Sequence, residues 1–243
     1  MNEPRRAGTA TVIVALDVDS LATAEGLVDR LDGQVSHFKI GSQLFTACGP
    51  AAIDAVRKRG GQVFLDLKFH DLPSTAAGAA REAARLGVFM FTVHAAGGVA
   101  MMRAAAEAAA GAAQEIGAPP PLVVAVTVLT SLDRATLHRE LAVASSVEGH
   151  VLHLCQMAKE AGLDGTVASP REIAAIRTQM GRAWTIVTPG IRPAGSDVGD
   201  QARTATPAAA ARAGAHYLVV GRPITAAPDP AAAARALLAE IGP

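Results

Sequence analysis

The stretch QVFLDLK (residues 62–68), followed by TAAGAAREAARLG (residues 75–87), decides the fold of this chain. The first segment is a short apolar run, typical of a strand buried on both faces and hence of a parallel sheet. The second segment is rich in alanine and ends at Gly87, as helix C-termini often do. Together the two segments predict one strand–helix unit.

The same unit recurs along the chain. Short apolar runs begin at residues 11, 37, 62, 90, 122, 165, 184 and 217, and a helical stretch follows each of them. Eight units in 243 residues favour an α/β fold of the closed (β/α)8 type, the TIM barrel. A doubly wound open sheet is the alternative, but no G-x-G-x-x-G follows the first run. We expect an N-terminal extension at residues 1–10 and a single barrel domain at residues 11–243.

The composition argues against several classes of protein. With 22 basic and 22 acidic residues and 3% aromatic residues, the chain lacks the basic surplus and stacking platforms of nucleic-acid-binding proteins. No uninterrupted apolar stretch of about 18 residues and no signal peptide is recognisable, so we expect no membrane contact and a cytoplasmic location. Cys48 and Cys155 lack metal-ligand spacing and are expected to be small core residues.

Polar residues gather at the ends of the predicted strands. In a (β/α)8 barrel these ends meet at one mouth, where the reactive groups lie. The residues at the ends are Asp17, Lys39, Asp66, Lys68, His94, Thr130, Ser131, Ser169, Arg192 and Arg222. One polar strand end can simply mark where solvent begins, but the whole set predicts an active site. His94 can act as a base, although a hydrogen-bonded packing role is the favoured interpretation.

The motif DLKFHD (residues 66–71) is the sharpest case. Asp66 and Lys68 are two positions apart on a strand, so both side chains point to the same side. Together with Lys39 and Asp71 they predict an alternating network in the order Lys39–Asp66–Lys68–Asp71. Nearby carboxylates favour the ammonium form of a lysine, which suits a fixed proton donor. The alternative is a purely structural network, whose desolvation must be offset by good pairing.

A second cluster, VVGRPIT (residues 219–225), follows the last strand. Gly221 permits close backbone approach, and Arg222 can donate two hydrogen bonds to a phosphate. The loops after strands seven and eight commonly form the phosphate site of such barrels. The long loop after the seventh strand carries Arg192 and Gln201. A Gly-Arg pair alone is a weak signal, but its combination with this loop predicts phosphate binding.

The motifs resemble those of the orotidine 5'-phosphate decarboxylase family. They occur in family order and cover nearly the whole chain after about residue ten. The motifs are ALDV (15–18), FKIGSQLF (38–45), DLKFHDLPST (66–75), VHAAGG (93–98), VTVLTS (126–131), TPGIRPAGSDVGDQAR (188–203) and VVGRPIT (219–225). Leu72 and Ser74 stand where Ile and Asn are frequent, but neither position carries charge.

The resemblance implies decarboxylation of orotidine 5'-phosphate (OMP) to UMP and CO2 in pyrimidine biosynthesis, without metal or cofactor. It implies that Lys68 protonates C6, with Asp66 and Asp71 as the other catalytic charges. Residues implied to bind the substrate are Asp17 and Lys39 at the ribose, Thr130 and Ser131 at the pyrimidine, and Gln201, Gly221, Arg222 and Arg192 at the phosphate and its closing loop. In a homodimer, Asp71 and Thr75 are implied to reach the partner's site.

Two alternatives stay open. A metal-dependent barrel enzyme, such as 3-keto-gulonate-6-phosphate decarboxylase or hexulose-phosphate synthase, would carry an acidic residue near the end of strand two. This chain has Lys39 there, which argues against a cation site. A non-catalytic phosphate-binding barrel would show a broken charge network, and none of the expected charges is missing.

Overall fold

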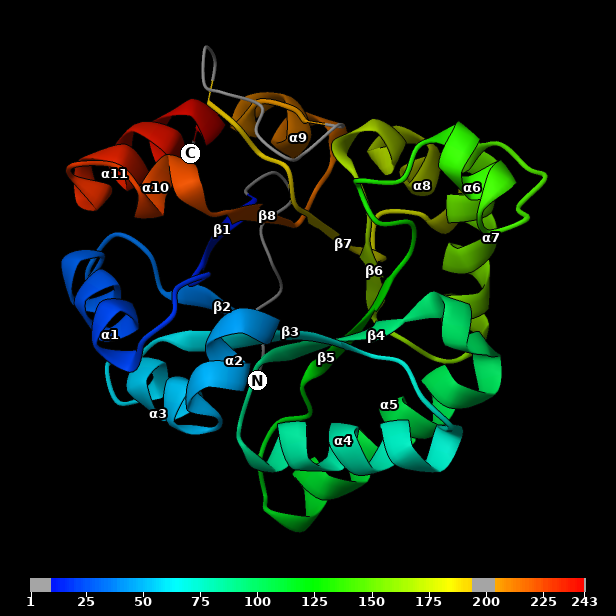
Figure 1. Ribbon diagram of the computed structural model, residues 1–243, viewed down its shortest axis with the longest axis horizontal. Coiled ribbons are helices and arrows are strands. Elements are labelled where there is room, and N and C mark those ends of the chain that lie inside the picture. Colours follow the sequence, from blue (N-terminus) through cyan, green and yellow to red (C-terminus); the bar gives the residue numbers. More distant parts are fainter. Residues whose placement is uncertain (1–9, 194–203, 243) are drawn as a thin grey trace.

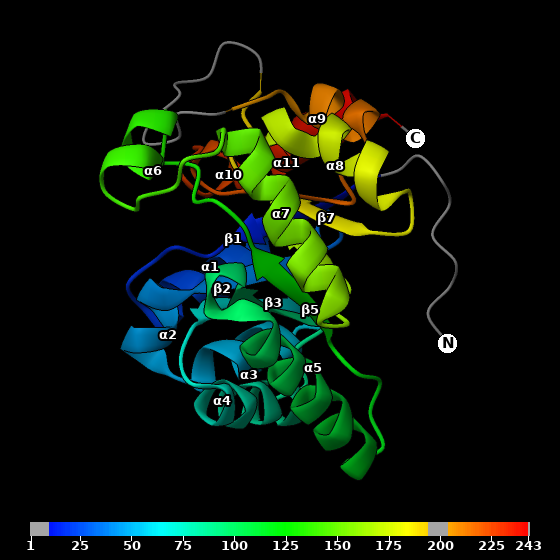
Figure 2. The ribbon, with the colours of Figure 1, turned by 90° about the vertical axis from the view of Figure 1, so that its right-hand side faces the viewer.

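Eight parallel strands pair in sequence order and close on themselves, so that β1 pairs with both β2 and β8. The computed structural model describes residues 10–193 and 204–242. Figure 1 shows the strands in the centre and the helices in a ring around them, and Figure 2 shows the same barrel from the side. The predicted single (β/α)8 barrel is confirmed. The predicted extension, residues 1–10, lies outside the described residues except for Ala10.

Strands and helices alternate along the chain. The strands are β1 (Thr11–Ala15), β2 (His37–Gly41), β3 (Gln62–Phe69), β4 (Met90–His94), β5 (Leu122–Val126), β6 (Gly165–Val167), β7 (Thr185–Thr188) and β8 (Tyr217–Val220). The helices are α1 (Leu21–Arg30), α2 (Ser42–Cys48), α3 (Ala51–Arg57), α4 (Pro73–Arg85), α5 (Gly98–Glu115), α6 (Arg134–Arg139), α7 (Val147–Glu160), α8 (Ile173–Met180), α9 (Pro207–Ala213), α10 (Arg222–Thr225) and α11 (Pro230–Ile241). Two 3-10 helices, η1 (Ala95–Gly97) and η2 (Pro170–Glu172), follow β4 and β6.

Several helices begin at a capping residue that the sequence supplies. The side chains of Ser20, Asp133 and Asp229 each accept a hydrogen bond from the backbone N–H three residues further on. These caps satisfy N–H groups that a helix start leaves unpaired. Pro207 and Pro230 occupy the first positions of their helices. A backbone N–H at this position has no partner within the helix, so the missing N–H of proline costs nothing there. The helix starts are thus encoded locally.

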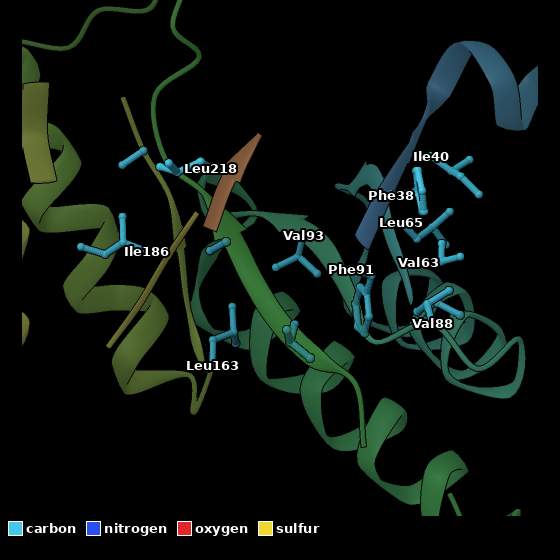
Figure 3. Packing of buried hydrophobic residues seen from close by; sticks show 14 of the residues in the cluster. Phe38, Ile40, Val63, Leu65, Val88, Phe91, Val93, Leu163, Ile186 and Leu218 are labelled. Atoms are coloured by element: carbon cyan, nitrogen blue, oxygen red, sulfur yellow. The ribbon is translucent and has the colours of Figure 1, made fainter. Parts of the chain in front are cut away.

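Apolar side chains form two clusters, because alternate residues of a strand point to opposite sides. The outer cluster lies between strands and helices and includes Phe38, Leu65 and Phe91, which Figure 3 shows from close by. The inner cluster fills the barrel with Ile13, Ala15, Phe64, Met90, Val124, Val187, Tyr217 and Val219. The barrel is therefore a packed core, and polar residues at the strand ends lie beyond it.

Several predicted strands run past the observed ends. The runs at residues 11–18 and 122–130 predict longer strands, but β1 ends at Ala15 and β5 ends at Val126. The apolar character continues beyond the ladder because residues such as Val128 line a pocket at the barrel mouth. Hydrophobicity alone does not distinguish these two environments.

The structure also bears on the expectations for the two cysteines and for membrane-spanning segments. Cys155 is buried in the outer cluster and Cys48 is half-buried against it, as expected for small core residues. Burial raises the pKa of the Cys155 thiol to about 11. In the parts of the chain that the structure describes, every helix is too short or too polar to cross a membrane.

Candidate active site

A pocket of about 580 Å³ opens at the C-terminal ends of the strands. The predicted site residues in its wall are Asp17, Lys39, Asp66, Lys68, Thr130, Ser131, Arg192, Gly221 and Arg222. Asp71, Thr75 and His94 lie outside this wall, and Gln201 lies outside the described residues. Barrel closure therefore brings together side chains from loops and strand ends that are far apart in the sequence.

Four charged side chains form a row across β1, β2 and β3. Lys39 Nζ donates a hydrogen bond to Asp17 Oδ1 at 2.9 Å and lies 3.6 Å from Asp66 Oδ2. Lys68 Nζ donates to Asp66 Oδ1 at 3.0 Å. The two inner side chains, Lys39 and Asp66, are only 11% and 14% exposed, whereas Lys68 is 38% exposed. Each inner charge thus has two partners of opposite sign, as burial requires, and the Lys68 ammonium lies on the more open side.

Gly41, the last residue of β2, leaves the space that this row occupies. A Cβ at Gly41 would lie 2.8 Å from Lys39 Nζ and 3.1 Å from Asp17 Oδ1. Real Cβ atoms do not approach other heavy atoms as closely as 2.8 Å, so a larger residue would displace the ammonium. Gly41 was not predicted as a site residue, although its place at the end of a predicted strand was an available signal.

The backbone of β3 is irregular where it carries Lys68. The strand pairs Leu65 with Phe91 and Phe69 with Val93. An advance of four residues along β3 therefore corresponds to an advance of only two residues along β4. Within this bulge Lys68 has a φ of 53°, a left-handed conformation that is uncommon for a residue with a side chain. The sequence predicts simple alternation here. The ammonium still reaches the carboxylate two positions earlier, but it does so from a bulged strand.

Thr92, opposite the bulge, is a second residue that the sequence analysis missed. It is 0% exposed. Its Oγ1 accepts a hydrogen bond from the backbone N–H of Lys68 at 2.8 Å and donates one to Asp66 Oδ1 at 3.1 Å. Alternation on β4 was the available signal, since it puts Thr92 on the same side as Met90, which fills the barrel interior.

Asp71 lies outside the row of charges within one chain, which differs from the predicted network. It is exposed, and its Oδ1 accepts a hydrogen bond from the backbone N–H of Leu72 at 2.6 Å. Among ion pairs of the described residues, none involves Asp71. The chain leaves the barrel after β3 and enters α4 at Pro73, which carries Asp71 away from Lys68. Thr75, in the first turn of α4, is also exposed. The predicted roles of both residues stay predictions.

His94 makes the contacts of a hydrogen-bonded packing residue. Its Nδ1 accepts a hydrogen bond from the backbone N–H of Ala96 at 3.3 Å, and its ring stacks on His70 with centroids 5.2 Å apart. Burial lowers the pKa of His94, and the charges of His70 and Lys68 lower it further. A neutral, hydrogen-bonded ring fits the packing interpretation. The stacked His70 was not foreseen.

Two loops supply positive charge on the side of β7 and β8. Gly190 has a φ of 76°, which glycine adopts readily, and it turns the chain after β7 toward Arg192. Gly221 and Arg222 come from the loop after β8, where the short helix α10 begins. Both arginines line the pocket. Arginine side chains bind phosphate through charge-assisted, often paired hydrogen bonds, so this side can hold a phosphorylated ligand.

The remaining wall is largely apolar. Val126, Val128 and Leu129 line it from β5 and the following loop, and Val167 and Ala168 line it from the end of β6. The sequence pattern predicts strands for these residues, so their place in the pocket wall was not predicted. A pocket with an apolar wall and a few convergent polar groups is typical of a small-molecule site.

Lys39 occupies the strand-two position where a metal-dependent barrel enzyme would carry an acid. Within residues 10–193 and 204–242, no group of three or more His, Cys, Asp or Glu side chains is arranged to hold a metal ion. The positive charge between Asp17 and Asp66 is instead the Lys39 ammonium. A reaction without metal stays a prediction.

Comparisons with known proteins show the family of the chain. The model of the family described as "Orotidine 5'-phosphate decarboxylase / HUMPS family" matches residues 10–237. A protein of Moorella thermoacetica named orotidine 5'-phosphate decarboxylase is 60% identical over 95% of this chain and 91% of its own length. One of Syntrophotalea carbinolica with the same name is 53% identical over 95% and 94%. The crystal structure of the enzyme from Lactobacillus acidophilus covers 96% of this chain and 100% of its own, with a TM-score of 0.86 and 37% identity. The chain belongs to the orotidine 5'-phosphate decarboxylase / HUMPS family.

Proposed function

We propose that this protein is an orotidine 5'-phosphate decarboxylase, which converts OMP to UMP and CO2 in de novo pyrimidine biosynthesis. The observation that carries the proposal is the Asp17–Lys39–Asp66–Lys68 row, which ends in the pocket wall that also holds Arg222. The named relatives favour this activity over the sugar-phosphate enzymes that share the barrel. The barrel, residues 11–243, is the catalytic domain in this proposal, and the cytoplasm is its location.

The chemistry needs a proton donor at one carbon atom. The bond between C6 of OMP and its carboxylate breaks, CO2 leaves, and the electron pair stays on C6. The pyrimidine offers no electron sink for this carbanion, so a positive charge must be held beside it. The Lys68 ammonium, 3.0 Å from Asp66, supplies that charge and gives C6 its proton. Asp66 lies beside the carboxylate of OMP that departs as CO2. The two negative charges repel each other, which destabilises the substrate before the bond breaks. Lys68 then regains a proton from solvent.

The rest of the substrate is held away from the reacting carbon. In this proposal Gly221, Arg222 and Arg192 bind the 5'-phosphate, together with Gln201. Asp17 and Lys39 bind the ribose hydroxyls, and Thr130 and Ser131 face the pyrimidine. Contacts to the phosphate lower the barrier when they strengthen as the transition state forms.

A homodimer completes the site in this proposal. Asp71 and Thr75 are exposed, and Leu72 between them is 70% exposed. A second copy covering this segment would remove apolar surface from water and would bring the Asp71 carboxylate to the partner's Lys68. Each site would then combine Lys68 of one chain with Asp71 of the other.

Subunit mixing tests the shared site. Lys68→Ala and Asp71→Ala are each expected to be inactive alone. Co-expression gives mixed dimers, half of the total, in which one of two sites is complete, so about a quarter of wild-type activity returns. A mixture that stays inactive although mixed dimers are isolated would show that Asp71 does not act across the dimer.

An ultraviolet assay of OMP disappearance tests the activity itself. The purified protein is assayed with OMP before and after exhaustive treatment with EDTA, with 3-keto-gulonate 6-phosphate and hexulose phosphate as rival substrates. We expect turnover of OMP alone, unchanged by the chelator. Activity that returns only with magnesium, or turnover of a sugar phosphate in place of OMP, would contradict the proposal.

A further inference from the structure

We propose that Thr92 is a positioning residue, whose hydroxyl sets the place of Lys68 relative to Asp66. This inference rests on the proposed decarboxylase function. Thr92 is fully buried and does not line the pocket, so it acts through its two neighbours. Its Oγ1 bonds the backbone N–H of Lys68 at 2.8 Å and Asp66 Oδ1 at 3.1 Å.

The bulge in β3 explains why a side chain is needed at this point. A regular parallel strand would pair its N–H groups with carbonyl groups of β4. The bulge interrupts the ladder between Leu65 and Phe69, and the N–H of Lys68 bonds the Thr92 hydroxyl instead. That bond supports a left-handed backbone at Lys68, with φ 53°. Without the hydroxyl, the half-buried N–H of Lys68 would lose its acceptor, and the backbone would lose one of its restraints.

The direction of the second bond follows from the first. A hydroxyl has one proton, and Oγ1 is already an acceptor for the N–H of Lys68. The proton is therefore available to Asp66 Oδ1, the same oxygen that accepts from Lys68 Nζ at 3.0 Å. Asp66 Oδ2 is left facing Lys39 at 3.6 Å. Thr92 thus fixes both the rotation of the carboxylate and the backbone that carries the ammonium.

Three substitutions separate the hydroxyl from the bulk of the side chain. Thr92→Val removes the hydroxyl and keeps the shape, Thr92→Ser keeps the hydroxyl, and Thr92→Ala removes it without crowding if the valine variant does not fold. Thr166→Val is the matched control. Thr166 is also 0% exposed, and its hydroxyl accepts from Trp184 Nε1 at 3.1 Å in the outer cluster, away from the pocket.

The experiment measures kcat and KM for OMP, the dissociation constant for UMP, and the thermal midpoint of each variant and of the wild type. For Thr92→Val we expect kcat to fall about ten- to hundredfold, with UMP binding changed less than about threefold. Thr92→Ser should recover kcat to within about fivefold of wild type. Thr166→Val should lower the thermal midpoint to a similar degree and leave kcat unchanged.

Each other result overturns a specific claim. A wild-type protein without OMP turnover contradicts the proposed function. An active wild type with an equally active Thr92→Val overturns the positioning role alone. The role is also overturned if Thr92→Ser is as slow as Thr92→Val, or if Thr166→Val loses as much kcat, because loss of packing would then explain the effect.

Discussion

Gly41 and Lys39 are so close that a methyl group on Gly41 would press against the Lys39 ammonium. A Cβ at Gly41 would lie 2.8 Å from Lys39 Nζ, which is the terminal atom of a flexible side chain. The chain can relieve that contact by moving the ammonium, which costs little stability. The movement would break the 2.9 Å bond to Asp17 and open the row of charges at its centre. The glycine therefore matters for charge placement more than for folding.

Gly41→Ala should reduce kcat/KM for OMP by about ten- to hundredfold, because one charge-assisted hydrogen bond is disturbed. The thermal midpoint should change by only a few degrees. Gly26→Ala is the control, because a Cβ at this position in α1 meets nothing within 4 Å. It should keep full activity and gain slightly in stability, since alanine favours helix. Full activity of Gly41→Ala would show that the Lys39–Asp17 geometry does not matter for turnover.

Lys68→Ala should abolish turnover and leave a folded protein that binds UMP. Lys68 lines the pocket and is the most open ammonium of the row, at 38% exposed. Its loss removes the proposed proton donor. The assay needs high enzyme concentration, a cooperative melt and a UMP titration, with Lys58→Ala on the exposed surface as control. Retention of more than about a tenth of wild-type kcat, a barrier change below roughly 1.4 kcal/mol, would assign the proton to another group.

Arg222→Ala should weaken the use of a phosphorylated substrate. The lost charge-assisted bonds to a dianion correspond to about 2–4 kcal/mol in kcat/KM, which is tens- to several-hundredfold. Orotidine, which lacks the phosphate, should be turned over equally by variant and wild type. Arg235→Ala, an exposed position on α11, is the charge-matched control. Equal losses with OMP and orotidine would show that Arg222 does not bind the phosphate.

His94 should make the protein less stable in mild acid. Because burial lowers its pKa below the ordinary value of 6.5, the native state binds fewer protons than the unfolded state between those two values. The free energy of unfolding should therefore fall as pH falls from about 6.5 toward the native pKa. His94→Gln should flatten this slope in urea unfolding measured from pH 7.5 to 5, whereas His138→Gln on exposed α6 should not. Identical slopes in wild type and His94→Gln would contradict the effect.

The repeated strand–helix pattern is enough to predict the barrel and most of the polar residues in the pocket wall. Strand ends converge in any closed barrel, so Asp17, Lys39, Asp66 and Lys68 could be placed together without knowing a distance. The same reasoning gave Arg222, because loops after the last strands share one side of the mouth. The pattern therefore predicts which residues lie together at the barrel mouth.

The pattern does not predict how they meet. Nothing in DLKFHD distinguishes a bulged strand from a regular one, so the left-handed backbone of Lys68 and the part taken by Thr92 were missed. A threonine in a strand is also an ordinary β-former. Asp71 was expected beside Lys68, but the turn into α4 decides its direction, and local spacing does not encode that turn. Gln201 lies outside the described residues.

Barrel closure has a consequence for the order in which the chain folds. β1 leaves the ribosome about two hundred residues before its partner β8, in which Tyr217 lies beside Thr11. Pairings so distant in sequence form slowly, because a long loop must be closed before they contribute. Until then β1 has an open edge toward β8, and the pocket wall that holds Asp17 lacks Arg222, which follows β8. A nascent chain can thus build the helices between β1 and β8 early, but it acquires a complete pocket only after β8 has been made, and its unpaired edge is exposed to other chains in the meantime.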